Sequence, residues 1–259
     1  QPEIAVAAAD GAPVFLRRPQ PAPVDAEERR LEMLYRDRVE FASGHGVAVH
    51  AEVGAGDPRR AVRLVTRVMP TYEVSPTTAP TAEDRPALAE LELDMQALAE
   101  APPAALPPML TPLVTAYGEW IGEQGTRIGT DAARLDGHEA TAEEALRACR
   151  RAMGRIAEGI RVLEDDPLAC RAFQFANRAM ALQRVHSIHA QEVRRGRRTA
   201  SAPLDDLDVP QNRSWRPFQL AFVLLNLPAL TDLRHADRVH PTEAVCDLLW
   251  FPTGGGKTE

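Results

Sequence analysis

Apolar residues that recur at alternating intervals of three and four constrain the fold of this chain more than any other feature. The first stretch with this spacing contains Leu146, Cys149, Met153, Ile156, Ile160 and Leu163. The second contains Leu168, Ala172, Phe175, Ala179, Leu182, His186 and His189. Such residues share one face of an α-helix. Asp166-Pro167 between the stretches is typical of a helix cap and first turn. We therefore predict two amphipathic helices that pack as an antiparallel pair.

The period of the apolar pattern is two before residue 70. The two alternating stretches contain Val47, Val49, Ala51 and Val53, and then Val62, Leu64, Thr66 and Val68. Residues 54–58, Gly-Ala-Gly-Asp-Pro, are turn-forming. This pattern predicts a β-hairpin or two neighbouring strands, because successive side chains of a strand point to opposite faces.

Other segments predict further elements. Residues 1–24 contain five prolines and read as an extended arm or linker. A helix is expected from Asp25 to an end at Gly44-His45-Gly46. Its expected apolar side contains Leu31, Leu34 and Tyr35 and could extend to Val39 and Phe41. A short helix is expected near Leu88 to Leu98, and a helical face of Leu110, Leu113, Val114, Tyr117 and Ile121 after it. Arg216 to Leu227 reads as a buried helix, and Val245 to Phe251 as a buried parallel strand.

These elements indicate an α+β, mainly helical fold. A small β element and a helical bundle precede the start of a RecA-like α/β lobe. The expected domain ranges are an arm at 1–24, an accessory domain at 25–200 and the beginning of the lobe at 214–259. The chain opens as Gln1-Pro2-Glu3 without methionine, so we expect a piece of a longer protein.

Composition excludes some classes of protein. No apolar run reaches the roughly 18 residues needed to span a membrane, and no signal peptide is visible, which favours the cytoplasm. The net charge of −7 argues against a broad nucleic-acid platform, although Arg194, Arg195, Arg197 and Arg198 could touch phosphate locally. His186 and His189 share a helix face, but no acidic or cysteine partner lies at a spacing that suits a metal.

The one lysine of the chain, Lys257, follows a run of glycines. It stands in Phe251-Pro-Thr-Gly-Gly-Gly-Lys-Thr258, directly after the expected strand, while every other basic side chain apart from histidine is arginine. A strand that runs into a glycine-rich turn ending in Lys-Thr is the arrangement of a P-loop. We expect ATP to be bound by Thr253, Gly254, Gly255, Gly256, Lys257 and Thr258. Lys257 and Thr258 are the expected catalytic residues, and Thr258 is the expected Mg²⁺ ligand.

The form of the motif narrows the class of nucleotide-binding protein. Phe251 occupies the position where many P-loop proteins have their first glycine. Superfamily 2 helicases often lack that glycine, and Pro252 to Thr258 resembles their form. Arg216-Pro-Phe-Gln219 resembles the upstream element in which a helicase glutamine binds adenine. Gln219 can both donate and accept, which matches adenine N6 and N7. The alternative is a surface glutamine at a helix start.

Several segments together resemble the helicase subunit of the DISARM phage-defence system. They are Leu34 to His50, Met69 to Val74, Phe175 to Gln183 and Asp247 to Glu259. The resemblance implies an ATP- and Mg²⁺-dependent superfamily 2 DNA helicase or translocase, with DNA and a helicase-associated protein as partners. It also implies that this chain stops at the first helicase motif. The Asp-Glu motif and the second lobe would then lie elsewhere, and the chain alone would be inactive and bind ATP weakly. The alternatives are another P-loop NTPase, or a non-catalytic module that binds DNA or a partner.

Overall fold

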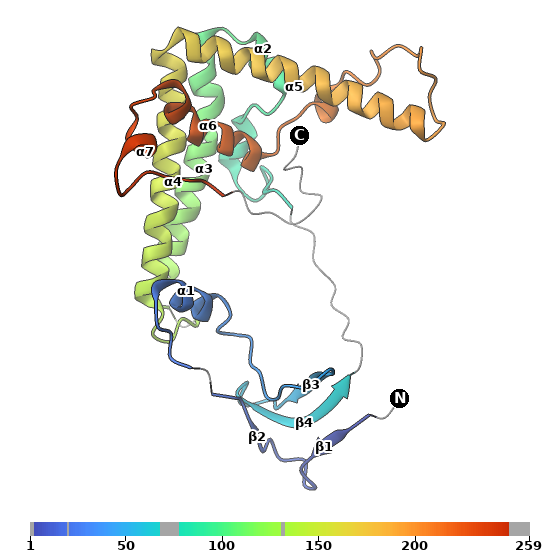
Figure 1. Cartoon of the computed structure of the whole chain (residues 1–259), viewed down its shortest axis with the longest axis vertical. Helices are drawn as coiled ribbons and strands as arrows, with labels where there is room; N and C mark the ends of the chain where they lie inside the picture. The colour runs from blue at the N-terminus through green and yellow to red at the C-terminus, as the bar shows by residue number, and fades with distance from the viewer. Residues whose placement is uncertain (1–2, 20, 68–77, 131–132, 249–259) are drawn as a thin grey trace. The chain divides into compact units, whose positions relative to one another are not determined.

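The computed structural model describes residues 3–19, 21–67, 78–130 and 133–248. It confirms a mainly helical α+β fold with a small antiparallel sheet (Figure 1). The chain forms two compact units, Gln1–Pro76 with Arg127–Glu144, and Thr77–Thr126 with Ala145–Glu259. The expected ranges 1–24, 25–200 and 214–259 concern functional domains and stay a prediction. The start of a RecA-like lobe also stays a prediction.

The sheet of the first unit is built around one strand, β4 (Arg60–Arg67). β3 (Ala48–Val53) pairs with β4 in antiparallel register, which confirms the predicted hairpin. The connection is a tight turn in which the Asp57 carboxylate accepts a hydrogen bond from the Arg59 N–H at 2.8 Å. Asp favours this turn because its side chain accepts from its own backbone two residues further on. The paired register places Ala61 and Val65 of β4 in the interior.

Two short strands of the sheet come from the proline-containing segment 1–24. β1 (Ala5–Ala7) and β2 (Phe15–Leu16) both pair with β4 in antiparallel direction. They lie one after the other along the edge of β4 that is opposite β3. The Thr66 hydroxyl and the Ile4 N–H are joined at 2.9 Å beside β1. The prolines of this segment lie outside both strands, so they remove no ladder hydrogen bond. The segment that the prolines suggested as an arm therefore takes part in the sheet.

Helix α1 (Ala26–Leu34) starts where predicted but ends earlier. The Asp25 carboxylate caps it by accepting from the Glu28 N–H at 2.9 Å. The predicted apolar side was wrong, because Leu31, Leu34 and Tyr35 are exposed. The buried residue is Met33, which packs with residues of the α3–α4 connection. A helix that ends ten residues before Gly44 cannot present the longer face that the pattern suggested.

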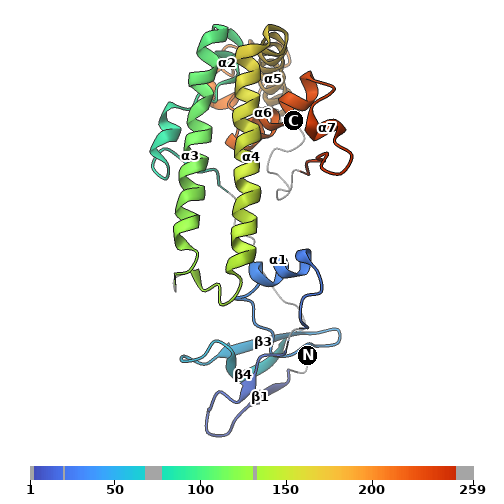
Figure 2. The same cartoon turned by 90° about the vertical axis from the view of Figure 1, so that its left-hand side faces the viewer.

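The second unit contains the helices that follow α1, except for the last residue of α3 and the first residues of α4. They are α2 (Met95–Glu100), α3 (Leu106–Arg127), α4 (Glu139–Asp165), α5 (Pro167–Arg194), α6 (Pro217–Thr231) and α7 (Ala236–Val239), with 3₁₀ turns at Pro86–Glu90, Pro103–Ala105 and Pro210–Asn212. The single helix expected near 88–98 is thus a 3₁₀ turn followed by α2. Figures 1 and 2 show α3 and α4 side by side. Their buried residues include most of those predicted, among them Leu110, Leu113, Ile156 and Ile160.

The predicted antiparallel pairing of α4 and α5 was wrong. Only Asp166 separates the two helices, and its carboxylate caps α5 by accepting from the Leu168 and Ala169 N–H groups. A helical hairpin needs a connection of two to five residues, so α5 instead runs across the end of α4 and packs on α2 (Figure 1).

The buried face of α5 also differs from the prediction. The interior residues are Ala169, Cys170, Phe173, Asn177, Ala181 and Val185, whereas the predicted Leu168, Phe175 and Leu182 face solvent. Two apolar faces lie on this helix, and the sequence pattern selected the one that lacks Asn177. The face with Asn177 is buried because a partner for its amide lies in the core.

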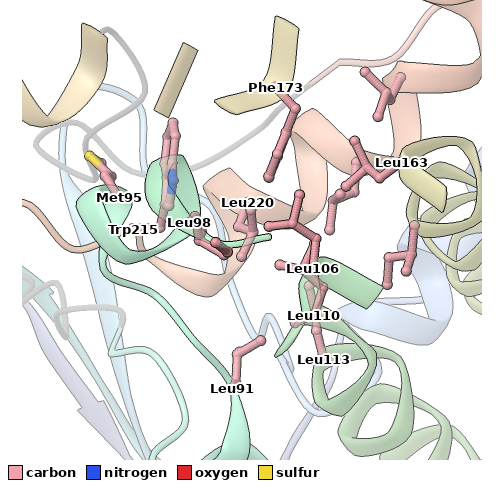
Figure 3. Close-up of a cluster of buried hydrophobic side chains, with 14 of the residues drawn as sticks. Leu91, Met95, Leu98, Leu106, Leu110, Leu113, Leu163, Phe173, Trp215 and Leu220 are labelled. Carbon is pink, nitrogen blue, oxygen red and sulfur yellow. The ribbon is translucent and has the colours of Figure 1, made fainter. Parts of the chain in front are cut away.

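A single apolar cluster joins the elements of the second unit. Figure 3 shows Leu98 of α2, Leu106 at the start of α3 and Leu220 of α6 pointing toward one another, and none of the three is exposed. Each buried leucine contributes about 1.5–3 kcal/mol relative to an exposed one. Burial in this cluster therefore places α6, with Gln219 at its start, firmly among the other helices.

Candidate nucleotide-site approach

The predicted nucleotide motif itself lies outside the described residues. Residues 249–259 contain Thr253, Gly254, Gly255, Gly256, Lys257 and Thr258, so the assignment of these residues to ATP and Mg²⁺ stays a prediction. The described structure contains Gln219 and residues 232–248, which lead to the motif. Both are held in place by contacts that sequence reasoning did not identify.

Gln219 has a defined local contact at the start of α6. Its side-chain carbonyl accepts a hydrogen bond from the Arg216 N–H at 2.9 Å, and Pro217 occupies the first helical position. A side-chain contact of this kind satisfies a backbone donor that the helix leaves unpaired. Gln219 therefore has a structural function at the helix start. Its contact with adenine stays a prediction.

The residues directly before α6 are fixed by a partly buried ion pair. The Arg213 guanidinium donates to both carboxylate oxygens of Asp94, from Nε at 2.8 Å and from Nη2 at 3.1 Å, and it also binds Asp208. Backbone bonds run beside it, from the Met95 N–H to the Arg213 carbonyl and from the Trp215 N–H to the Leu93 carbonyl. Bidentate pairs of this type fix orientation as well as distance.

The Asp94 carboxyl carries a shifted pKa. Burial acts to raise its pKa, but the hydrogen bond from Arg213 and the bond from the Gln96 N–H outweigh burial and lower the pKa below its ordinary value. A group whose pKa is lowered on folding stabilises the fold above its unfolded pKa. That contribution is lost as the pH falls through the folded pKa.

We predict that Asp94→Asn destabilises the protein in a pH-dependent way. At pH 7 the variant should lose about 2 kcal/mol of unfolding free energy, since a hydrogen bond to a charged partner becomes a neutral one. The difference should shrink as the pH falls below about 4, where the wild-type carboxyl also takes up a proton. Urea unfolding of both proteins across this range measures it. An equal loss at neutral and acidic pH would contradict the assignment.

A buried amide completes the support under α6. The Trp215 indole N–H donates to the Asn177 side-chain carbonyl at 2.7 Å, and the Asn177 amide donates to the Phe173 carbonyl at 2.9 Å. Asn177 is 1% exposed. Because both polar ends are satisfied, a polar residue is tolerated in this interior. The hydrogen bond between Trp215 and Asn177 therefore links α5 to the residue two positions before Pro217, where α6 begins.

Arg155 of α4 anchors the segment that leads to the motif. Its guanidinium binds both carboxylate oxygens of Asp247, at 2.7 and 2.6 Å, and its Nε lies 2.6 Å from an oxygen of Asp237. The bond with Asp247, with the charges of both carboxylates, raises the pKa of Arg155 despite its burial. The Val245 N–H also donates to the Asp237 carbonyl at 2.7 Å. Asp247 therefore places the chain on α4 one residue before the described part ends.

Helix α6 approaches α4 very closely at Gly159. A Cβ added to Gly159 would lie 1.9 Å from the Leu224 carbonyl oxygen, a distance that real side chains do not reach. Near the same contact, the His235 ring lies 3.3 Å from the Glu158 carboxylate. The glycine within the apolar stripe of α4 is the sequence signal that could have indicated this contact.

The predicted parallel strand is not present in its described part. Residues 245–248 have no strand geometry, and Val245 and Leu248 are exposed. A parallel strand needs neighbouring strands as hydrogen-bond partners. The described strands all belong to the sheet of the first unit. Residues 249–251 of the predicted strand lie outside the described residues.

The arginine cluster at 194–198 takes part in local ion pairs. Arg198 binds Asp206, while Arg195 and Arg197 lie 3.8 and 3.7 Å from Glu192. Pairing of this kind is typical of a solvated helix end. His189 lies 3.3 Å from the Ala200 carbonyl, and the described part of the chain contains no group of side chains suited to a metal. None of its helices is long and apolar enough to cross a membrane.

A surface pocket of about 290 Å³ in the first unit was not foreseen. Its walls include Arg134, Asp37, Arg59 and Asp136, which form ion pairs at 2.7 Å and 3.9 Å. Arg36 donates to three backbone carbonyls, those of Met33, Ala133 and Arg134, and so joins α1 to the α3–α4 connection. The charges of the pocket are largely neutralised by these contacts, which indicates a structural arrangement.

Comparison with known proteins shows similarity to a DISARM protein. No family model matches the chain. The chain is 35% identical over 235 residues to the DISARM protein DrmA of Bacillus paralicheniformis. The match covers 88% of this chain and 19% of the relative, so the chain spans about a fifth of the length of that protein. A match of this extent includes residues of both compact units.

Proposed function

We propose that this chain is part of a DISARM protein that acts in defence against phage by hydrolysing ATP to move along DNA. The similarity to the DISARM protein DrmA supports membership in this system. The observation that carries the ATP proposal is the segment Pro252 to Thr258, in which the only lysine of the chain follows three glycines. A role on phage DNA also implies the cytoplasm as its location.

The donor groups of the motif fit a nucleotide with Mg²⁺. Backbone N–H groups of Gly254, Gly255 and Gly256 can converge on phosphate oxygens, because no Cβ obstructs them. The Lys257 ammonium is compact enough to contact both the β- and γ-phosphates, and the Thr258 hydroxyl can bind the metal. Mg²⁺, when bound, supplies positive charge against the phosphates.

Phe251 and Gln219 favour the helicase class over other P-loop proteins. Phe251 takes the place of the glycine that kinases and AAA+ proteins usually have. Gln219 lies at the start of a helix that is fixed by Asn177, Trp215 and Arg213. A rigid support of this kind suits a side chain that selects one base, because selection requires a fixed donor and acceptor.

The anchoring of residues 232–248 supports a coupling function. Asp247 is bound to α4 through Arg155, and α6 is packed on α4 through Gly159. Both segments that flank the proposed nucleotide therefore rest on the same helix. We propose that movement of the ATP site is transmitted through α4 to the helical unit and from there to DNA or a partner protein.

We predict that Gln219→Glu removes the preference for adenine. The variant keeps the carbonyl-type oxygen that accepts from Arg216, so the helix start should stay intact. It loses the amide donor for adenine N7, and the KM for ATP should rise roughly 10- to 100-fold. Steady-state hydrolysis of ATP and GTP, compared between the native protein and the variant, measures the effect.

The thermal stability of the same variant is the control. An unchanged Tm with a raised KM separates base recognition from helix capping. An unchanged KM for ATP and an unchanged ratio of ATP to GTP hydrolysis would show that Gln219 only caps the helix.

A second candidate function is that of a non-catalytic module that binds a partner. The exposed apolar face of α5 favours it. This function is compatible with the first, since a motor protein can also carry a docking surface.

A further inference from the structure

Helix α5 carries a stripe of exposed apolar side chains. We call it the α5 stripe, and it consists of Leu168, Ala172, Phe175, Ala179 and Leu182. Leu168 is 68% exposed, Phe175 is 75% exposed and Leu182 is 53% exposed. Isolated apolar residues are common on protein surfaces, but an aligned series on one helix marks an interaction site.

The spacing of the α5 stripe is that of a helix–helix seam. Its members follow at intervals of four, three, four and three, so large side chains at 168, 175 and 182 alternate with alanines at 172 and 179. Such a seam keeps facing a partner helix over several turns, and large side chains can enter spaces that the alanines leave. The other face of α5 is already buried against α2 and the core, so the stripe is not needed for the fold of the second unit.

The charge beside the stripe indicates the chemistry of its partner. No aspartate or glutamate occurs from Pro167 to Gln191, although the whole chain has a net charge of −7. Arg171 and Arg178 border the stripe, one helical turn to either side of Phe175, and both are exposed. Neither forms an ion pair with any residue that the structure describes. A partner with carboxylates along this edge would complement both guanidinium groups.

We propose that the α5 stripe docks an amphipathic helix of a partner protein, with an apolar face edged by aspartate or glutamate. Two copies of α5 fit less well, because pairing them would bring arginines together without any acid. Nucleic acid fits less well because four of the five residues of the stripe are leucine or alanine, which have neither a charge for phosphate nor a ring that stacks on a base. The proposal names a partner for the proposed defence function, but it does not depend on the ATP site.

A photo-crosslinking amino acid at position 175 of the native protein, expressed in its host, tests the proposal. Mass spectrometry should identify one crosslinked peptide that belongs to another protein, with apolar residues at intervals of three and four and acidic residues beside them. A crosslinker at Gln191, which is exposed on α5 but outside the stripe, is the control and should not capture this peptide.

A synthetic peptide of the captured sequence then tests the charges. Its binding, followed by fluorescence anisotropy, should weaken at least about 10-fold in the double variant Arg171→Glu, Arg178→Glu, and a peptide with arginines in place of its acidic residues should restore it. Crosslinks to α5 of a second copy, to DNA, or to another segment of the same chain would overturn the proposal. So would no crosslink, or equal binding by the double variant. ATP turnover of that variant reports separately on the proposed motor function.

Discussion

Lys257→Ala is expected to lower the rate of ATP hydrolysis by the native protein at least about 100-fold, while the helical unit stays folded. The reason is that a lysine at this position neutralises charge on the β- and γ-phosphates as the bond between them breaks, and removing one such group typically costs a factor of 10² to 10³. Phosphate release measures the rate, and circular dichroism with thermal unfolding measures the fold.

Two further variants make the result specific to the lysine. Lys257→Arg keeps the charge but replaces a compact ammonium by a wide planar group, so it should also be inactive. Arg234→Ala removes an exposed basic residue outside the motif and should keep wild-type turnover. Normal ATP hydrolysis by Lys257→Ala would rule out the P-loop.

Gly159→Ala is expected to be the most destabilising small substitution in the second unit. The new methyl group would meet the Leu224 carbonyl at 1.9 Å, so α4 and α6 must separate. Overpacking of this kind costs about 3 kcal/mol, which corresponds to a drop in Tm of roughly 10 °C for a protein of this size. Thermal unfolding followed by circular dichroism measures the change.

Gly154→Ala, on the same helix, is the matched control. A Cβ at Gly154 meets no atom within 4 Å. Alanine there should raise the unfolding free energy by about 0.5–1 kcal/mol, because it favours the helix and restricts the unfolded chain. If both variants had the same stability, the close contact between α4 and α6 would not exist.

Local patterns predicted most elements of the fold. The alternation around Val49 and Leu64 identified the β3–β4 hairpin, and Asp166-Pro167 identified the start of α5. These predictions succeed because strand period, turn chemistry and helix caps depend on residues close in sequence. The pairing of β1 and β2 with β4 could not be read this way, since strands of two or three residues carry no period.

The buried face of α5 was predicted wrongly for a physical reason. Leu168, Phe175 and Leu182 are more apolar than the buried face of α5, which contains Asn177. Asn177 is buried because the Trp215 indole, 38 positions away, satisfies its carbonyl. No local pattern contains that information. The apolar face that the pattern identified is a docking surface in our proposal.

In the candidate site, too, local features could be predicted from the sequence and long-range contacts could not. The glycine run and Lys257 are visible in the sequence, whereas the contacts that hold the neighbouring segments are not. Arg155 and Asp247 are 92 positions apart, and Asp94 and Arg213 are 119 positions apart. Each pair joins common charged residues that have many alternative partners in the sequence, so only the folded structure identifies it.

Photolabelling with 8-azido-ATP in the presence of Mg²⁺ tests the central claim most directly, because it reports which residues lie beside the adenine. We predict that the labelled peptide of the native protein contains Gln219, that excess ATP prevents labelling, and that Lys257→Ala reduces it strongly. Labelling that is confined to peptides outside 216–222 and 252–258, or that persists unchanged in Lys257→Ala, would contradict an ATP site formed by α6 and the glycine–lysine motif.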